Sequence, residues 1–133
     1  MTLRVEVVAP EGEVWAGDAQ RVIAKTLDGD IGILTGHTPV LGILAPGSIV
    51  RILPQGDQAA GGELTGAVSG GFLAVADDRV SILARQAQLG SGVDRAATQA
   101  ALDEALEAAG PGDEESADVR YLRAQLRAAG DQA

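Results

Sequence analysis

The chain has 133 residues, 46 % of them hydrophobic, so it is long enough to enclose one compact core. Its net charge of −9 argues against nucleic acid as a partner, because phosphate binding requires a concentrated basic surface, and against docking on an anionic membrane. The absence of cysteine excludes disulfides and thiolate chemistry. We recognise no signal peptide and no apolar stretch of about 20 residues that would span a bilayer.

The first two thirds of the chain consist of short apolar stretches separated by Gly, Pro and Asp. Leu3, Val5 and Val7 recur with the two-residue period of a half-buried strand. Further strands are predicted at residues 20–26, 31–34, 48–53, 64–69, 72–76 and 79–84. Strands about 8–12 residues apart with turns between them predict an antiparallel sandwich or barrel. No stretch before residue 93 is long enough for the helices that a parallel α/β sheet needs.

The composition changes near residue 93, after which Ala, Glu, Gln, Leu and Arg dominate. Asp94 is the predicted N-cap of a helix extending to Ala109, and a second helix is predicted at residues 114–129. The expected apolar stripes are Ala97, Ala101, Leu102, Ala105, Leu106 and Ala109 on the first helix and Val119, Leu122, Leu126 and Ala129 on the second. Small Ala side chains bury little area, so this hairpin is expected to need the β domain or a partner. We therefore predict two domains, residues 1–90 and 91–133.

Few residues in the chain could carry catalytic or metal chemistry. His37 is the only histidine, and no spacing typical of a zinc or calcium site accompanies it. Ser69 lies in a near match to the nucleophile elbow of serine hydrolases, but strand residues follow where that elbow requires a helix. Gly29, Gly32 and Gly36 lack the following Lys-Ser or Lys-Thr of a phosphate loop. We therefore expect neither catalysis nor a bound metal.

Three arginines of the second predicted helix, Arg120, Arg123 and Arg127, are spaced to share one helical face. They could form a solvated face paired with Asp118 and Glu115, or they could be presented to an acidic partner. From the residues alone, the solvated face is the favoured interpretation, because exposed ion pairs are common and weak.

The segment Gly29-Asp-Ile-Gly-Ile-Leu-Thr-Gly-His-Thr-Pro-Val-Leu41 resembles a signature of the epsilon subunits of rotary ATP synthases, Gly-(Asp/Glu)-(Ile/Leu)-Gly-(Ile/Leu)-x-Pro-Gly-His-x-Pro. Further similar segments are Val14–Gly17, Pro46–Arg51, Ser69–Val75 and Val80–Ala84. The similarity covers about residues 3–92 in register, and the helical tail matches in layout. It departs from the family at Thr35, where Pro is usual, so the turn there is expected to be looser.

The resemblance implies an antiparallel β-sandwich of about ten strands in two sheets, followed by an antiparallel two-helix hairpin. It implies a non-catalytic subunit of the central stalk of a proton-driven ATP synthase. Such a subunit couples rotation of the membrane c-ring to the catalytic head through the gamma subunit, and its helices inhibit ATP hydrolysis. The implied partners are the gamma subunit, the c-ring and the alpha and beta catalytic subunits.

The implied location is the cytoplasmic face of the cell membrane, reached only through the complex. The alternative is a free-standing β-sandwich that binds a small ligand or peptide, which would leave the Gly-His-x-Pro signature unexplained.

The resemblance also implies which residues meet the c-ring. They are Gly29, Asp30, Ile31, His37 and Pro39, with Asp30 at the acidic position of the signature. All five are expected to shape one edge of the sandwich.

For the second helix, the resemblance implies that Arg120, Arg123 and Arg127 contact the beta or gamma subunit, which reverses the preference for a solvated face. Many family members open the first helix with an Asp-x-x-Arg-Ala motif associated with ATP binding. Here Ala97 occupies the position of that arginine, and Arg95 lies about 200° away around the helix. We therefore expect no cofactor and weak or absent ATP binding.

Overall fold

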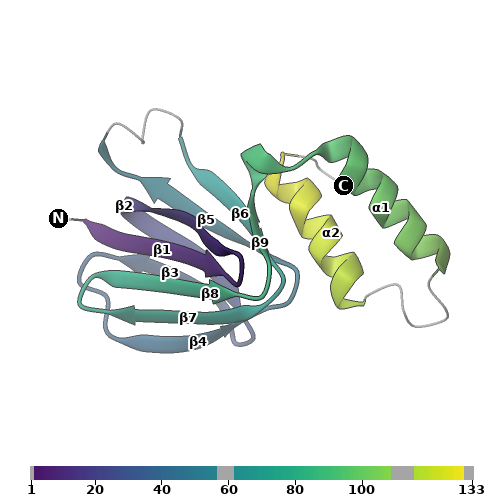
Figure 1. Ribbon diagram of the computed structural model, residues 1–133. Helices are drawn as coiled ribbons and strands as arrows, with labels where there is room; N and C mark the ends of the chain where they lie inside the picture. The colour runs from purple at the N-terminus through teal and green to yellow at the C-terminus, as the bar shows by residue number, and fades with distance from the viewer. Residues whose placement is uncertain (1, 57–61, 109–115, 131–133) are drawn as a thin grey trace.

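The computed structural model describes residues 2–56, 62–108 and 116–130 and contains a β-sandwich with two helices packed on one flank (Figure 1). The strands are β1 (Leu3–Ala9), β2 (Gly12–Thr26), β3 (Gly29–Leu34), β4 (Val40–Leu44), β5 (Ser48–Pro54), β6 (Leu64–Val68), β7 (Gly71–Ala76), β8 (Arg79–Ala84) and β9 (Ala87–Leu89). A 3-10 turn (Gly90–Gly92) leads to helices α1 (Arg95–Ala108) and α2 (Ala117–Ala128). The predicted sandwich with a C-terminal helical hairpin is confirmed, with nine strands among the described residues.

The 15-residue strand β2 connects the two layers of the sandwich. Its first half pairs antiparallel with β1, and its second half pairs with β3 on one side and β5 on the other. The order β1-β8-β7-β4-β2 closes on itself through the β1–β2 pairing, and β1 and β8 form a parallel pair. The pattern predicted only residues 20–26 of this strand, because Val14, Trp15 and Ala16 are all half-buried and do not alternate.

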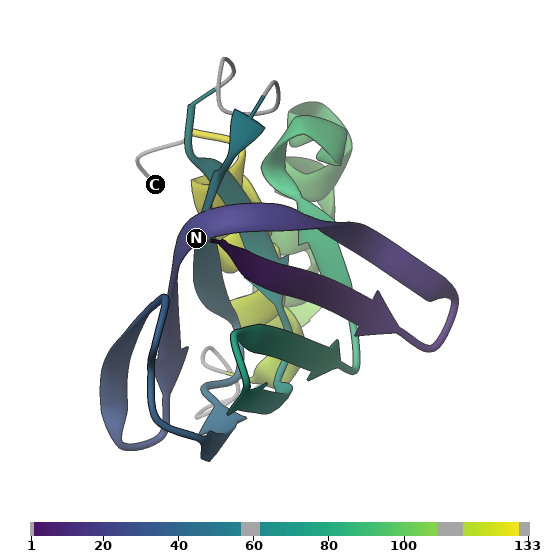
Figure 2. The same cartoon turned by 90° about the vertical axis from the view of Figure 1, so that its left-hand side faces the viewer.

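The core between the layers is aliphatic, as the composition predicted. Side chains at alternate strand positions, such as Leu3, Val5, Leu73 and Ile82, are fully buried and belong to one continuous cluster. Strand β4 was not predicted because its outward-facing residues are also apolar, which removes the alternation. Figure 2 views the sandwich from the N-terminal side, with the helices behind it.

Helix α1 begins as predicted, because the Asp94 carboxylate accepts a hydrogen bond from the Ala97 amide at 3.1 Å. The predicted apolar stripe is wrong at Ala97, which is exposed; Thr98 and Leu102 are the buried residues of this helix. A small Ala side chain gains little from burial, so its position does not fix the orientation of the helix. The predicted helix ends at Ala109 and at residues 114–115 lie outside the described residues. Neither described helix combines the length and hydrophobicity needed to cross a bilayer.

Helix α2 lies between α1 and the sandwich (Figure 1) and has two apolar faces. Val119 and Leu126, on the predicted stripe, are buried in the cluster that joins α2 to α1. Tyr121 and Ala124 form a second face that packs against Ala67 of β6. The second face was not predicted, because alanine and tyrosine give a weak signal of burial in a helical pattern. The hairpin is thus stabilised by contact with the β domain, as expected.

Candidate interaction surfaces

The residues expected at the c-ring contact begin at the hairpin that connects β2 and β3. Gly29 has a φ of +121°, in a region that favours glycine, and its carbonyl accepts a hydrogen bond from the Thr26 hydroxyl at 2.8 Å. Asp30 is exposed and lies directly across from Lys25 of β2. Ile31 is half-buried and packs against the core. The structure therefore presents Asp30 to solvent at one end of β3.

His37 and Pro39 lie beyond the opposite end of β3. The His37 amide donates to the Leu34 carbonyl at 3.1 Å, and Gly36 has a φ of +87°, which together are typical of a type II turn with Thr35 at its second position. The imidazole Nδ1 of His37 lies 2.7 Å from the Thr38 carbonyl, so its polar contact is local.

The five expected c-ring residues therefore form two groups rather than one cluster. Asp30 and Leu34 are four residue steps apart, a rise of about 14 Å along β3.

Ser69 is not placed to act as a nucleophile with the single histidine. It precedes β7, and its amide donates to the Gln86 carbonyl at 3.0 Å. The turn that holds His37 lies at the other end of β7, where the Gly36 amide donates to Asp78. The length of β7, about 20 Å, separates the two side chains, which is far beyond hydrogen-bond reach. No group of three or more metal-ligating side chains occurs within the described parts of the chain.

The outer surface of β4, β7 and β8 carries an apolar face that the sequence analysis did not identify. Ile43 lies across from Phe72, and Phe72 lies across from Leu83. These side chains are 51 %, 53 % and 52 % exposed, and the neighbouring Leu41 is 73 % exposed. We call these four residues the apolar face. Contiguous large apolar side chains on a surface indicate a protein contact. The available sequence signal was Leu41 and Ile43 on a strand whose inward positions are also apolar.

The three arginines of α2 share one face of the helix, as their spacing predicted, and line a groove between this helix and the sandwich. We call it the arginine groove. It has a volume of about 570 Å³ and is lined by Lys25, Thr26, Leu27, Ala45, Pro46, Gly47, Arg120, Arg123 and Arg127. The Arg127 guanidinium donates to the Gly47 carbonyl at 3.2 Å, which fixes one side of the groove. The contributions of Lys25 and of the turn at Gly47 were not predicted, because only the tertiary fold brings them to α2.

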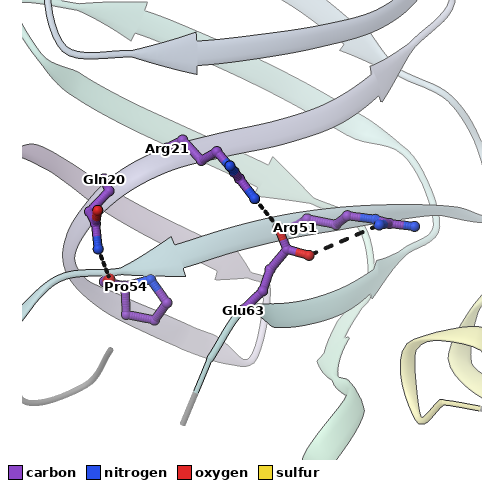
Figure 3. Close-up of polar contacts among 5 residues, drawn as sticks. All are labelled: Gln20, Arg21, Arg51, Pro54 and Glu63. Atoms are coloured by element: carbon purple, nitrogen blue, oxygen red, sulfur yellow. Dashed lines mark hydrogen bonds and ion pairs between the residues drawn. The ribbon is translucent and has the colours of Figure 1, made fainter. Parts of the chain in front are cut away.

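A second basic cluster lies on the adjoining strands β2 and β5. The Glu63 carboxylate lies 3.3 Å from the Arg21 guanidinium and 4.0 Å from that of Arg51, and so bridges the two strands (Figure 3). The Gln20 side chain donates to the Pro54 carbonyl at 3.1 Å and makes a second link between the same strands. Arg51 is 58 % exposed, and its ion pair with Glu63 is long and solvent-screened.

The fold and its surfaces define a class of protein, a β-sandwich domain that carries a C-terminal helical hairpin and presents apolar and basic contact surfaces. Residues 2–90 match the family described as ATP synthase, Delta/Epsilon chain, beta-sandwich domain. The chain is 49 % identical to an ATP synthase epsilon chain of Thermobifida fusca over 128 residues, which is 96 % of this chain and 91 % of the relative. The chain belongs to the ATP synthase epsilon chain family.

Two further comparisons concern the two parts of the fold. A Frankia casuarinae ATP synthase epsilon chain is 51 % identical over 89 residues, which is 67 % of this chain but 99 % of that relative. A solved structure of the Euglena gracilis mitochondrial ATP synthase, comprising OSCP, F1 and the c-ring, contains a chain with a TM-score of 0.66 and 22 % identity; the match covers 94 % of this chain and 75 % of that one. This second likeness supports the fold, including the helical hairpin.

Proposed function

We propose that the chain is a central-stalk subunit of a proton-driven ATP synthase that couples rotation of the c-ring to the catalytic head through the gamma subunit. Its membership of the epsilon chain family supports this role. The observation that carries the gamma contact is the apolar face on β4, β7 and β8. The subunit would lie at the cytoplasmic face of the cell membrane, held there by the complex.

The apolar face suits a permanent contact with gamma. Fully burying a large apolar side chain contributes about 1.5–3 kcal/mol, and these four are 51–73 % exposed, so covering each one adds roughly half to three quarters of that value. Their strands are backed by the fully buried core, which makes the contact rigid.

For the c-ring contact, the exposed Asp30 and the hairpin around it are the proposed centre. His37 and Pro39, beyond the far end of β3, are proposed to act as a separate contact.

The helical hairpin is proposed to regulate ATP hydrolysis. The Frankia relative supports this division of labour, because 89 residues of this chain account for 99 % of its length, which is about the size of the sandwich alone. Coupling is therefore assigned to the sandwich, and inhibition to the hairpin through contacts of Arg120, Arg123 and Arg127 with the beta or gamma subunit.

ATP is proposed to bind weakly or not at all. Ala97 is exposed and carries no charge, and the nearby Arg95 donates to the Ala129 carbonyl at the end of α2. That contact directs its guanidinium to the end of α2. Equilibrium dialysis with ATP and its magnesium complex measures this directly, and micromolar binding would contradict the proposal.

The gamma contact is tested with Phe72→Asp and Ile43→Asp in a quantitative pull-down with the gamma subunit. Each is expected to weaken binding at least tenfold, because a carboxylate would be buried without a partner. Leu34→Asp is the matched control, since Leu34 is 60 % exposed but lies on β3 opposite Arg21. Thermal unfolding of the three variants checks that the sandwich is intact. Binding of Phe72→Asp at the wild-type level would remove the apolar face from the proposal. A chain with no affinity for gamma at all would favour the alternative of a free-standing binding module.

Coupling and inhibition are tested by adding the chain to an ATP synthase that lacks epsilon. Recovery of proton pumping and a reduced rate of ATP hydrolysis are expected; no change in either would reject both roles. The double charge reversal Arg123→Glu and Arg127→Glu is expected to relieve inhibition while leaving coupling in place. Inhibition that survives this change would show that the arginines do not carry it.

A further inference from the structure

We propose that Asp78 is a positioning residue for the second c-ring contact, because its carboxylate binds the turn that carries His37. This inference rests on the proposed function, since it adds a residue to the contact assigned to His37 and Pro39. Asp78 lies outside the signature segment Gly29–Leu41, 42 positions along the chain from Gly36. The tertiary fold brings it to the turn from another hairpin.

The turn before β4 depends on this outside contact. The His37 amide donates to the Leu34 carbonyl at 3.1 Å and closes the turn. The Gly36 amide, at the third position of the turn, has no partner within it and donates instead to the Asp78 Oδ1 at 2.7 Å. This length is at the short end of the range for N–H···O bonds, as is typical of a charged acceptor. The bond fixes the peptide group immediately before His37.

Asp78 is itself held to the core of the sandwich. Asp77 and Asp78 are the two central residues of the β7–β8 hairpin, between the paired residues Ala76 and Arg79. Their φ angles of +51° and +61° are those of a type I′ turn, in which aspartate is a favoured residue. The Asp78 carbonyl accepts a hydrogen bond from the Arg4 amide at 2.9 Å, which ties the same residue to β1. One residue thus connects β1, the β7–β8 hairpin and the His37 turn.

The two turns form one surface. Val40 of β4 lies across from Val75 of β7, so the turn before β4 and the turn after β7 lie at the same end of the sandwich, away from the helices (Figure 1). Pro39 and Asp77 are exposed there, and Asp78 is half-buried between them and the core. A turn that is already fixed in its bound conformation loses less entropy when a partner binds. The Asp78 bond therefore favours binding through His37 without contacting the c-ring itself.

The test begins with the exchange rate of the Gly36 amide, measured by NMR in the full chain. Asp78→Gly removes the carboxylate and keeps the positive φ, and it is expected to speed exchange about three- to tenfold. Asp77→Gly is the matched control: it removes the same charge from the same turn and should stay within about twofold. Asp78→Asn retains a side-chain carbonyl at this position and should restore most of the protection. Thermal unfolding checks that each variant is folded.

Binding to the c-ring is then measured with the gamma–epsilon complex and an immobilised c-ring in detergent. Asp78→Gly and His37→Ala are each expected to raise the Kd about three- to tenfold, with Asp77→Gly and Asp78→Asn within about twofold of the wild type. The double variant Asp78→Gly with His37→Ala should bind no more weakly than the weaker of the two single variants, because Asp78 acts through the His37 turn.

Four results would overturn the proposal. Unchanged exchange of Gly36 in Asp78→Gly would mean that the bond does not hold the turn. Equal losses of c-ring binding in Asp77→Gly and Asp78→Gly would assign the effect to charge at the hairpin tip. Additive losses in the double variant would mean that Asp78 contacts the c-ring directly. Unchanged binding of His37→Ala would reject the contact at His37, and with it this role for Asp78; the exchange rate of Gly36 distinguishes that failure from a failure of Asp78 to hold the turn.

Discussion

Gly90 allows the end of α2 to pack closely against the sandwich, and its replacement by alanine tests how much this contact stabilises the packed helix. The residue lies between β9 and α1, directly under the C-terminal turn of α2. An added Cβ would lie 1.9 Å from the Ala128 carbonyl oxygen and 3.1 Å from the Thr65 hydroxyl. That hydroxyl donates to the same Ala128 carbonyl at 2.6 Å. One methyl group therefore collides with the Ala128 carbonyl and crowds the Thr65 hydroxyl, the two partners of the hydrogen bond that joins α2 to β6.

The expected cost follows from these contacts. To restore an ordinary contact of 3.4 Å, the end of α2 must move by about 1.5 Å, which breaks the hydrogen bond from Thr65. Loss of such a bond costs about 1 kcal/mol, and overpacking of a close contact costs about 1–3 kcal/mol. We expect a total of about 2–4 kcal/mol, equivalent to a roughly 30- to 700-fold shift in the docking equilibrium of the helix.

Native-state hydrogen exchange measures this shift segment by segment. Amides of α2 are expected to lose protection by that factor, whereas those of β1, β7 and β8 keep theirs, because the turn that contains Gly90 contacts α2 and β6. Gly92→Ala is the control, since its Cβ would make only ordinary contacts with Gln88 at 3.7 and 3.9 Å. Equal protection of α2 in the two variants would refute the view that Gly90 seats the helix.

Two further predictions concern a turn and a buried phenol. Thr35→Pro is expected to stabilise the fold by about 0.4–1 kcal/mol, because proline fixes the φ that the second position of a type II turn requires; Gly36→Ala should destabilise it, since Gly36 has a φ of +87°. Urea unfolding measures both, and a destabilised Thr35→Pro would contradict the turn assignment. Burial, with a smaller contribution from Glu11, raises the pKa of Tyr121 above 10.0. The neutral phenol thus favours the folded state below pH 10.0, and this stability is lost as the pH rises through the higher folded pKa. Tyr121→Phe should remove this alkaline loss; an unchanged pH profile would contradict it.

The sequence by itself determined the fold class. Alternation in β1 and β8 and the composition change near residue 93 are local properties of the chain, so they predicted a sandwich followed by helices. The N-cap at Asp94 and the shared face of Arg120, Arg123 and Arg127 were also predictable, because helical spacing depends only on position in the chain.

Tertiary structure decided where the surfaces lie. The apolar face consists of side chains from three strands, and Ile43, Phe72 and Leu83 are cross-strand neighbours in it. The pattern within one strand does not predict which residues of the next strand lie opposite. Asp30 and His37 lie close together in one sequence signature, so they were expected to share an edge of the sandwich. In the structure the length of β3 separates them.

The division between the two levels is clearest at α2. Its spacing predicted one apolar stripe, whereas packing between α1 and the sandwich required two. The second face of α2 packs against β6, and its arginines line one groove with Lys25. Both arrangements bring together residues up to about 100 positions apart in the chain. Such contacts are fixed by how the packed layers fit together, not by the periodicity of any segment.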